Sequence, residues 1–465
     1  MKKLLVGAFA AMFLLCSAAQ VMAVELSSYG YMRITGQWLD NGYFVEKGES
    51  TPNDFAIAQR ARTYFDFTVN ENLKATVGLE WDSDWGSKED TSPGVGPDFR
   101  NSGLVLGGDQ NMIETKHLYL DFTFPGTQVA VRGGQYWVEL PSNLGSSILG
   151  GDMPALSINL PINDQSSLTV GWTRPYDLGA FGSGLTGDEQ DILFASLPLG
   201  ADGFSITPFG AYGFMGDGST FAAEGQSIGY AGATSLGYAG TSMAPFGDDV
   251  DAYWLGLSGD MSMMDPFVLK YDVNYGNMEG DDAETSGWYA DLIAELNMDM
   301  MTPQLYGFYG SGDDYDDVAN DDEGGRMPVY FTESFSPTAL AHAGCCVAGT
   351  VRDGQFSYHG AGLWSVGFAL RNIKFSDKIS AMAQIAYSEG TNDKEMASIY
   401  GSPYNNQLTD EDSSIEFGGE LQYYLYENLR AVAEAGYIAL DMDEDVWGTD
   451  YEDMSRVALS LDYSW

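Results

Sequence analysis

The sequence predicts an all-β fold, a closed antiparallel β-barrel that crosses a membrane. Three observations predict it. Apolar and polar residues alternate with a period of two in one segment after another, which is the pattern of strands with one face on an apolar medium. The connections between these segments are alternately short and long, as in transmembrane barrels. The chain is also rich in glycine, 57 of 465 residues, and in aromatic residues, 13%.

The alternation begins at 25–38, where Leu26 and Met32 share one face and Tyr31 and Arg33 share the opposite face. It continues to the end of the chain, and eighteen strands are expected, with sixteen as the alternative count. Most spans have about 10 to 13 residues, enough to cross a bilayer at a tilt. The expected strands are 25–38, 57–69, 73–85, 112–124, 128–138, 155–161, 166–174, 188–198, 203–215, 250–259, 266–277, 286–297, 302–311, 361–373, 378–389, 412–425, 429–440 and 455–465.

The lengths of the connections predict at which end of the expected barrel each one lies. We expect the short ones to be periplasmic turns and the long ones to be extracellular loops. The short connections include 70–72, 125–127, 162–165 and 426–428. The long connections include 39–56, 86–111, 139–154, 216–249, 312–360 and 441–454.

Residues 1–23 have the features of a secretory signal peptide: a basic start, an apolar run and small residues ending at Ala23. Residues 24–465 are then expected to form one transmembrane barrel. Without Lys2 and Lys3, 19 of the 21 basic residues remain against 67 acidic ones. This acidic balance excludes a nucleic-acid partner, which requires a basic surface.

The predicted inner face carries many charged residues, and a dry interior could not hold them. Barrels of 16 to 18 strands enclose water, so the sequence predicts a pore in the outer membrane. The charged or titratable residues of this face are Arg60, Arg62, Asp66, Lys74, Glu80, His117, Asp121, Arg132, Lys270, Asp272 and Glu416.

Five cations are candidates for a basic ladder that lines the pore and orders ions and polar solutes. The alternative is that the arginines only pair with lumenal acids such as Asp66. The ladder residues are Arg33, Arg60, Arg62, Lys74 and Arg132.

The segment 138–156 is less acidic than the other long connections and contains apolar residues such as Ile148 and Met153. We expect it to fold into the lumen as a constriction loop, with Glu139 and Asp152 facing the arginines. The alternative is an ordinary surface loop.

The densest acidic stretches are 312–325 and 441–453. Divalent cations that bridge these carboxylates to lipopolysaccharide are one hypothesis, and a solvated, self-repelling rim is the other. An EF-hand is rejected because Val446 occupies the position that requires glycine. No other metal or cofactor is expected. A vicinal disulfide between Cys345 and Cys346 is an alternative that the sequence does not decide.

Two enzyme-like patterns lack the context that their chemistry requires. The stretch 225–229 matches a nucleophile elbow without the strand-to-helix turn, and 182–187 matches a dinucleotide-binding pattern without the following helix. With three histidines in the chain, none beside a plausible serine nucleophile, we expect no enzyme.

The final strand, 455–465, ends on Tyr463 and Trp465, both on its lipid-facing row. We expect this strand to close the barrel against 25–38. The terminal aromatic pattern also resembles the signal that the outer-membrane assembly machinery recognises in its clients.

The segments 55–86, 112–142, 170–177 and 455–465 resemble the outer-membrane homotrimeric porin family known from sulfate-reducing bacteria, of general bacterial porin type. The resemblance implies a homotrimer surrounded by outer-membrane lipid and lipopolysaccharide, with an inward third loop and passive diffusion of ions and small hydrophilic solutes. A channel selective for oxyanions or sugars stays open as an alternative, as does a surface adhesin or structural barrel. The hypothesis of a selective channel is supported by four tyrosines of the predicted strands, Tyr29, Tyr31, Tyr64 and Tyr136.

Overall fold

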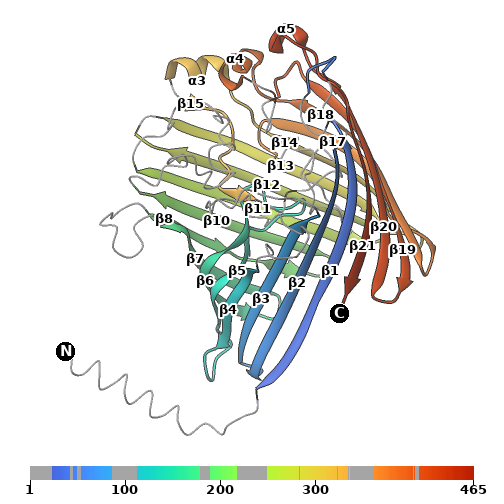
Figure 1. Cartoon of the computed structure of the whole chain (residues 1–465). Helices are drawn as coiled ribbons and strands as arrows, with labels where there is room; N and C mark the ends of the chain where they lie inside the picture. Colours follow the sequence, from blue (N-terminus) through green and yellow to red (C-terminus); the bar gives the residue numbers. More distant parts are fainter. Residues whose placement is uncertain are drawn as a thin grey trace.

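A single closed sheet forms the protein. In the computed structural model, 21 strands belong to one sheet, of which three are short additions, so eighteen strands form the ring. Each ring strand pairs antiparallel with the next along the chain, and β21 pairs with β1 (Figure 1). The predicted 18-stranded antiparallel barrel is confirmed. The structure describes residues 24–41, 45–49, 54–85, 113–177, 189–216, 249–281, 283–321, 323–332, 335, 360–401, 403 and 408–465.

The ring strands have lengths between 8 and 17 residues. They are β1 (Glu25–Asp40), β2 (Asp54–Asn70), β3 (Leu73–Asp84), β4 (Glu114–Thr123), β5 (Ala130–Glu139), β6 (Leu149–Asn163), β7 (Ser166–Asp177), β8 (Glu189–Ser196), β10 (Phe204–Met215), β11 (Val250–Met264), β12 (Phe267–Glu279), β13 (Glu284–Leu296), β14 (Thr302–Gly310), β17 (Leu363–Ser376), β18 (Ile379–Gly390), β19 (Ser413–Tyr426), β20 (Leu429–Asp441) and β21 (Met454–Ser464).

The additional elements are short. The strand β9 (Leu199–Ala201) continues β8 along β10, while β15 (Glu323–Gly324) and β16 (Phe331–Thr332) belong to the connection after β14. Short helices lie at one end of the barrel (Figure 1). They are α3 (Tyr315–Asp321), the 3-10 helix η1 (Lys394–Met396), α4 (Ala397–Tyr400) and α5 (Glu444–Trp447).

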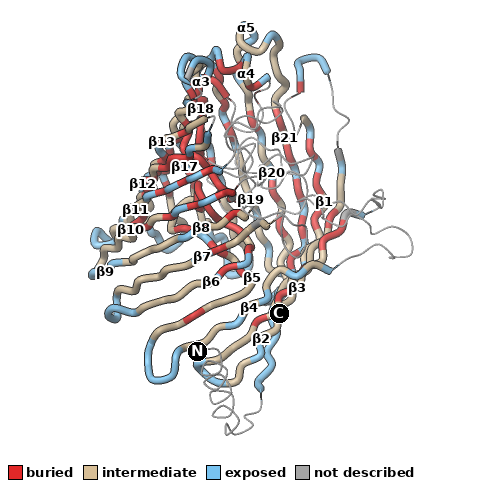
Figure 2. Tube along the Cα trace, turned by 90° about the vertical axis from the view of Figure 1, so that its left-hand side faces the viewer, coloured by how far each residue is buried: buried red, intermediate tan, exposed pale blue. Residues whose placement is uncertain are grey.

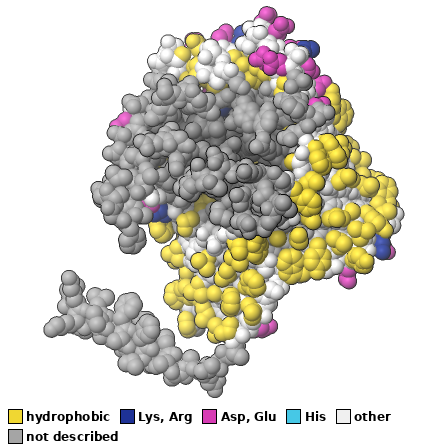
Figure 3. Space-filling model, in the orientation of Figure 1, with side chains coloured by type: hydrophobic (Ala, Val, Ile, Leu, Met, Phe, Trp, Pro, Cys, Tyr) yellow, Lys and Arg dark blue, Asp and Glu magenta, His cyan; other side chains and the backbone are white. Residues whose placement is uncertain are grey.

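The outer face of the barrel is apolar. On β21, Val457, Leu459 and Leu461 are 46%, 54% and 47% exposed, whereas Ala458 and Ser460 between them are buried. Figure 3 shows hydrophobic side chains over the wall of the barrel that it presents. An apolar surface of this extent would be unfavourable in water, so the outward row faces lipid and the barrel spans a membrane. No helix in the described ranges is long and apolar enough to cross one.

Short turns join the strands at the end opposite the helices, as at Glu71–Asn72 between β2 and β3. Two strand boundaries differ clearly from the prediction. The strand β11 ends at Met264 and not at 259, and β6 begins at Leu149 and not at 155. The intervening residues include Gly150, Gly151 and Pro154, which have poor strand propensity. Their pairing with the end of β5 overrides that propensity.

An apolar cluster fills part of the barrel interior. It includes Leu140, Ile148 and Leu149, each 1% exposed, together with Trp254 and Met327, which are fully buried. Buried residues concentrate in the half of the barrel nearer α3 and α4, and intermediate or exposed residues prevail toward the turns (Figure 2). The predicted signal peptide 1–23, the stretches 182–187 and 225–229, and Cys345 and Cys346 lie outside the described residues.

Candidate functional site

The inner wall of β1 to β5 brings the predicted cations together with acids. Alternate residues share a face, so the strand register decides which charges meet. The register places Arg60 opposite Asp82 and Arg62 opposite Glu80 on β3. It also places Arg33 opposite Arg60 on one side and opposite Asp462 on the other.

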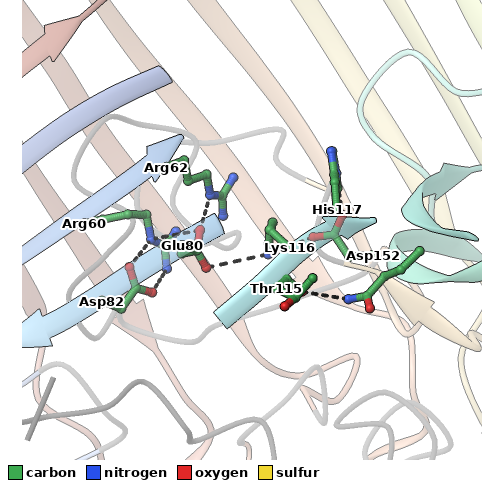
Figure 4. Close-up of polar contacts among 9 residues, drawn as sticks. Arg60, Arg62, Glu80, Asp82, Thr115, Lys116, His117 and Asp152 are labelled. Atoms are coloured by element: carbon green, nitrogen blue, oxygen red, sulfur yellow. Dashed lines mark hydrogen bonds and ion pairs between the residues drawn. The ribbon is translucent and has the colours of Figure 1, made fainter. Parts of the chain in front are cut away.

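Arg60 and Arg62 form a compact ion-pair cluster with these acids (Figure 4). Arg60 donates from Nε to Asp82 Oδ1 at 2.7 Å and from Nη2 to Asp82 Oδ2 at 2.5 Å, which is a bidentate pair. Arg62 Nε donates to Glu80 Oε2, and Arg60 Nε lies 3.7 Å from the same carboxylate oxygen. The acids are more buried than the cations, with Glu80 3% and Asp82 7% exposed.

The remaining cations of the predicted ladder are also paired. Arg33 Nη2 lies 3.8 Å from Asp462 Oδ2, and Lys74 Nζ lies 3.4 Å from Asp66 Oδ2. Arg132 donates to both oxygens of Asp121, at 2.7 and 2.9 Å.

The five predicted cations therefore all lie on the inner row, and each has a carboxylate partner. These contacts agree with the alternative that the arginines pair with lumenal acids. The expected pairing of an arginine with Asp66 was wrong, because Asp66 accepts hydrogen bonds from Lys74 Nζ and Thr76 Oγ1. The role of the ladder in ordering ions stays a prediction.

The expected constriction segment is shorter than 138–156. Val138 and Glu139 end β5, and Leu149 begins β6, so the connection comprises 140–148. Asp152 is therefore a strand residue. It lies 2.8 Å from Lys116 Nζ and 3.0 Å from His117 Nε2, not against the arginines (Figure 4).

Lys116 is a site residue that the sequence analysis missed. It lies at a register shift between β3 and β4, where the strict alternation of faces is interrupted. From there its Nζ lies 2.8 Å from Asp152 Oδ2 and 3.8 Å from Glu80 Oε1. It thereby extends the charge network from β2 and β3 to β6.

Glu139, the other acid expected to face the arginines, has different partners. Trp137 Nε1 donates to its Oε2 at 3.0 Å, and the backbone amide of Ser146 donates to its Oε1 at 3.3 Å. Its contacts thus tie the end of β5 to the connection 140–148.

The tip of the connection 140–148 contacts strands that are not neighbours of β5 or β6. The backbone amide of Asn143 donates to Asp272 Oδ2 at 2.6 Å, and its Nδ2 donates to Asp272 Oδ1 at 3.0 Å and Tyr271 O at 3.1 Å on β12. Since β7, β8, β10 and β11 separate β6 from β12 along the wall, this connection crosses the interior.

Asp272 itself faces a second acid. The register of β12 and β13 places it opposite Asp291, and the two are 0% and 5% exposed. Tyr289 Oη donates to Asp291 Oδ2 at 3.0 Å. Burying two neighbouring carboxylates is costly if both are ionised. The two Asn143 donors offset part of this cost at Asp272.

A second inward segment comes from the connection after β14, which the sequence analysis treated only as an acidic outer loop. Trp254 Nε1 donates to Pro328 O at 2.7 Å, and Tyr330 N donates to Ile148 O at 2.9 Å. The short strand β16 then pairs in parallel with β6 at Leu149. The apolar run at 327–331 within an acidic loop was the sequence signal for it. We call 140–149 with 326–332 the inner plug.

The acidic rim shows local pairing. Arg326 Nε lies 3.3 Å from Asp313 Oδ2, and both side chains are nearly fully buried. Asp443 caps α5, because its side chain accepts hydrogen bonds from the backbone amides of Asp445 and Val446. In the part of the chain that the structure describes, no group of three or more acidic, histidine or cysteine side chains is arranged to hold a metal.

The last strand closes the ring as expected. Trp465 N donates to Gly30 O, and Gly30 N donates to Trp465 O, both at 3.1 Å. The rings of Tyr463 and Trp465 stack at 5.8 Å between centroids, and both side chains are more than 40% exposed on the outer row. Their recognition by the assembly machinery stays a prediction.

Comparison with known proteins gives a match in fold. No family model and no curated protein matches the sequence. Solved structures do match: Pseudomonas aeruginosa OpdQ at 12% identity (TM-score 0.52, covering 95% of this chain and 97% of that one) and Acinetobacter baumannii OccAB3 at 12% (TM-score 0.53, 94% and 99%). Pseudomonas aeruginosa OccK2 (OpdF) matches at 11% (TM-score 0.53, 94% and 97%). At such identities the similarity establishes the barrel architecture.

Proposed function

We propose that this chain is an outer-membrane porin, through which ions and small hydrophilic solutes diffuse passively. The observation that carries the proposal is the closed 18-stranded ring with an apolar outer row and a charged inner row. A barrel of this size leaves room for water inside, and an inner row of charges is stable only beside water or in ion pairs.

The inner wall of β1 to β5 supports a water-filled passage. The side chains of Arg132 and Lys74 are 40% and 33% exposed, although they point away from the lipid. Pairs that are partly exposed on the inside of a barrel are solvated by water in the lumen.

The inner plug narrows this passage in the proposed channel. It rests on β11 to β13, where Asn143 and Trp254 anchor its two segments. Solutes then pass between the plug and the wall of β1 to β5. This gives the connection 140–148 the constriction role that the sequence suggested for 138–156.

Assembly and partners are part of the proposal. The family resemblance favours a homotrimer in outer-membrane lipid and lipopolysaccharide, and the outward Tyr463 and Trp465 suit recognition by the assembly machinery. No catalysis and no resident cofactor are proposed. Divalent cations at the acidic rim remain a hypothesis, tested by a calcium titration of the melting temperature.

Conductance in planar lipid bilayers tests the channel. Purified, refolded protein should insert in steps of large ohmic conductance, in triplets if it is a trimer. Single conductance steps would contradict the trimer but not the channel. Folded barrels that insert without conducting would contradict the channel and favour a structural or adhesive barrel.

A further inference from the structure

Five aromatic side chains form a continuous row on the inner wall of β1 to β5. The ring centroids of Tyr29 and Tyr64, and of Tyr64 and His117, lie 5.2 Å apart. His117 and Tyr119, and then Tyr119 and Tyr136, follow at 5.8 Å. These separations are those of rings in direct contact. We call these five residues the aromatic row.

A glycine makes room for the row. The register places Tyr29 opposite Tyr64, Tyr64 opposite Gly78, and Gly78 opposite His117. A Cβ atom at residue 78 would lie 2.7 Å from two ring atoms of Tyr64 and 3.0 Å from His117 Cβ. Any larger residue would push the Tyr64 ring away, so Gly78 allows the row to continue across β3.

Ion pairs border the aromatic row. The Arg132 guanidinium carbon lies 4.4 Å from the Tyr119 ring centroid and 5.3 Å from that of Tyr136. It remains bound to Asp121, whose side chain is 27% exposed. His117, inside the row, bonds to Asp152. The rings are therefore flanked by groups that can both donate and accept hydrogen bonds.

Most charges of this wall are paired. Six cations of β1 to β5 contact six carboxylates; Glu114 lies opposite Glu80 as a further acid, and Arg430 of β20 is a further cation on Asp462. The wall therefore offers each sign beside the other to a solute. The cations are Arg33, Arg60, Arg62, Lys74, Lys116 and Arg132, and the carboxylates are Asp66, Glu80, Asp82, Asp121, Asp152 and Asp462.

Tyr136 is 5% exposed and belongs to the apolar cluster, so the accessible part of the row is Tyr29, Tyr64, His117 and Tyr119. We propose that this part of the aromatic row is a binding track for sugars, and this inference rests on the proposed channel function. A pyranose presents a face of C–H groups that packs on an aromatic ring, and hydroxyl groups at its edge that donate and accept at once. The pairs Arg132–Asp121 and Lys74–Asp66 provide both partners for such hydroxyls. A small anion would meet a carboxylate beside each cation, which favours the neutral solute.

The continuity of the row has a further consequence. A linear oligosaccharide can contact several rings at once, so its second and third units bind at high effective concentration. We therefore expect maltohexaose to bind more tightly than glucose.

Sugar block of the ion current tests the track in the full-length protein. Maltohexaose should reduce the wild-type current with saturation, at lower concentrations than glucose. Tyr64→Ala and Tyr119→Ala should each raise the half-blocking concentration of maltohexaose about tenfold. Tyr119→Phe should stay within about twofold, because it keeps the ring. Tyr253→Ala, which removes an outward ring 41% exposed, should behave as wild type.

The outcomes separate the track from the channel. A normal ohmic current that neither sugar reduces would overturn the track and leave the channel intact, as would a sugar block unchanged in both alanine variants. Block by benzoate but not by sugars would overturn the sugar assignment. Folded protein without any current would overturn both proposals. If the alanine variants fail to fold, an unblocked wild-type current still rejects the track.

Discussion

The walls of β1 to β5 and of β11 to β13 carry polar inner rows in opposite surroundings. On the first, Arg60 and Asp82 neutralise each other and pairs such as Lys74–Asp66 remain partly exposed. On the second, Asp272 and Asp291 face each other, nearly fully buried, under the inner plug. The loops that fold inward thus decide which wall lines a passage and which becomes a core.

This contrast explains how one barrel can combine stability with a solvated interior. The plug side gains apolar burial around Trp254 and Met327, which an aqueous pore would otherwise lack. The opposite wall keeps most of its charges in pairs, which offsets the cost of placing them in a partly dehydrated site.

The largest expected effect is on the plug side. Trp254→Ala removes a fully buried ring and its hydrogen bond to Pro328, and should lower the free energy of unfolding by about 3–5 kcal/mol. Trp288→Ala, which removes an outward ring on β13 that is 54% exposed, should have a clearly smaller effect. Urea unfolding in detergent measures both, and equal losses would contradict a packed core at Trp254.

The tip of the plug provides the next test. Asn143→Ala removes the side-chain bonds to Asp272 and Tyr271 but keeps the backbone bond. It should lower the free energy of unfolding by about 1–2 kcal/mol and raise open-channel current noise as the tip moves. Asn297→Ala, in an exposed turn, is the control. Noise that is identical in both variants would mean that the contact does not position the plug.

On the opposite wall, the double variant Arg60→Ala, Arg62→Ala should change selectivity. It leaves the carboxylates of Glu80 and Asp82 without these partners. The ratio of cation to anion permeability should therefore rise about twofold, if permeating ions pass these carboxylates within the screening length. Reversal potentials in a salt gradient measure this ratio. Adding Glu80→Gln and Asp82→Asn should restore it, and an unchanged ratio in the double variant would place the arginines away from the narrow part of the channel.

The smallest expected effect is at the rim. Lys47 bonds to the Asp450 carboxylate and lowers its pKa below the ordinary 3.8. Because the folded pKa is the lower one, the pair stabilises the rim above the ordinary pKa of the acid and loses that contribution as pH falls through the depressed value. Lys47→Met should therefore change the melting temperature little at pH 7 and not at all near pH 2. A larger difference at pH 2 than at pH 7 would contradict this pairing.

Much of the fold was predictable because it depends on local rules. Alternation predicted the strands and placed all five ladder cations on the inner row. The partners of Arg60 and Arg62 depend on a bulge between Thr68 and Asn70, which shifts the β2–β3 register by one residue relative to the turn. Counting outward from the pair Asn70–Leu73 would place Ser83 opposite Arg60, so the pairs with Asp82 and Glu80 do not follow from the turn alone.

The rest depends on contacts that no local pattern encodes. Asn143 and Asp272 are 129 residues apart, and Trp254 and Pro328 are 74 apart. Lys116 enters the charge network through a register shift that alternation cannot anticipate. The division of the interior into a plugged side and an open side is therefore a tertiary property.

Access of an aqueous thiol reagent to the two walls tests that division most directly. In a background with Cys345→Ser and Cys346→Ser, Lys74→Cys on β3 and Ile293→Cys on β13 place one thiol on each wall, at positions 33% and 2% exposed. A charged methanethiosulfonate should reduce the current through the Lys74→Cys channel within seconds to minutes and leave the Ile293→Cys channel unchanged. Fast modification at residue 293 with none at residue 74 would contradict the account.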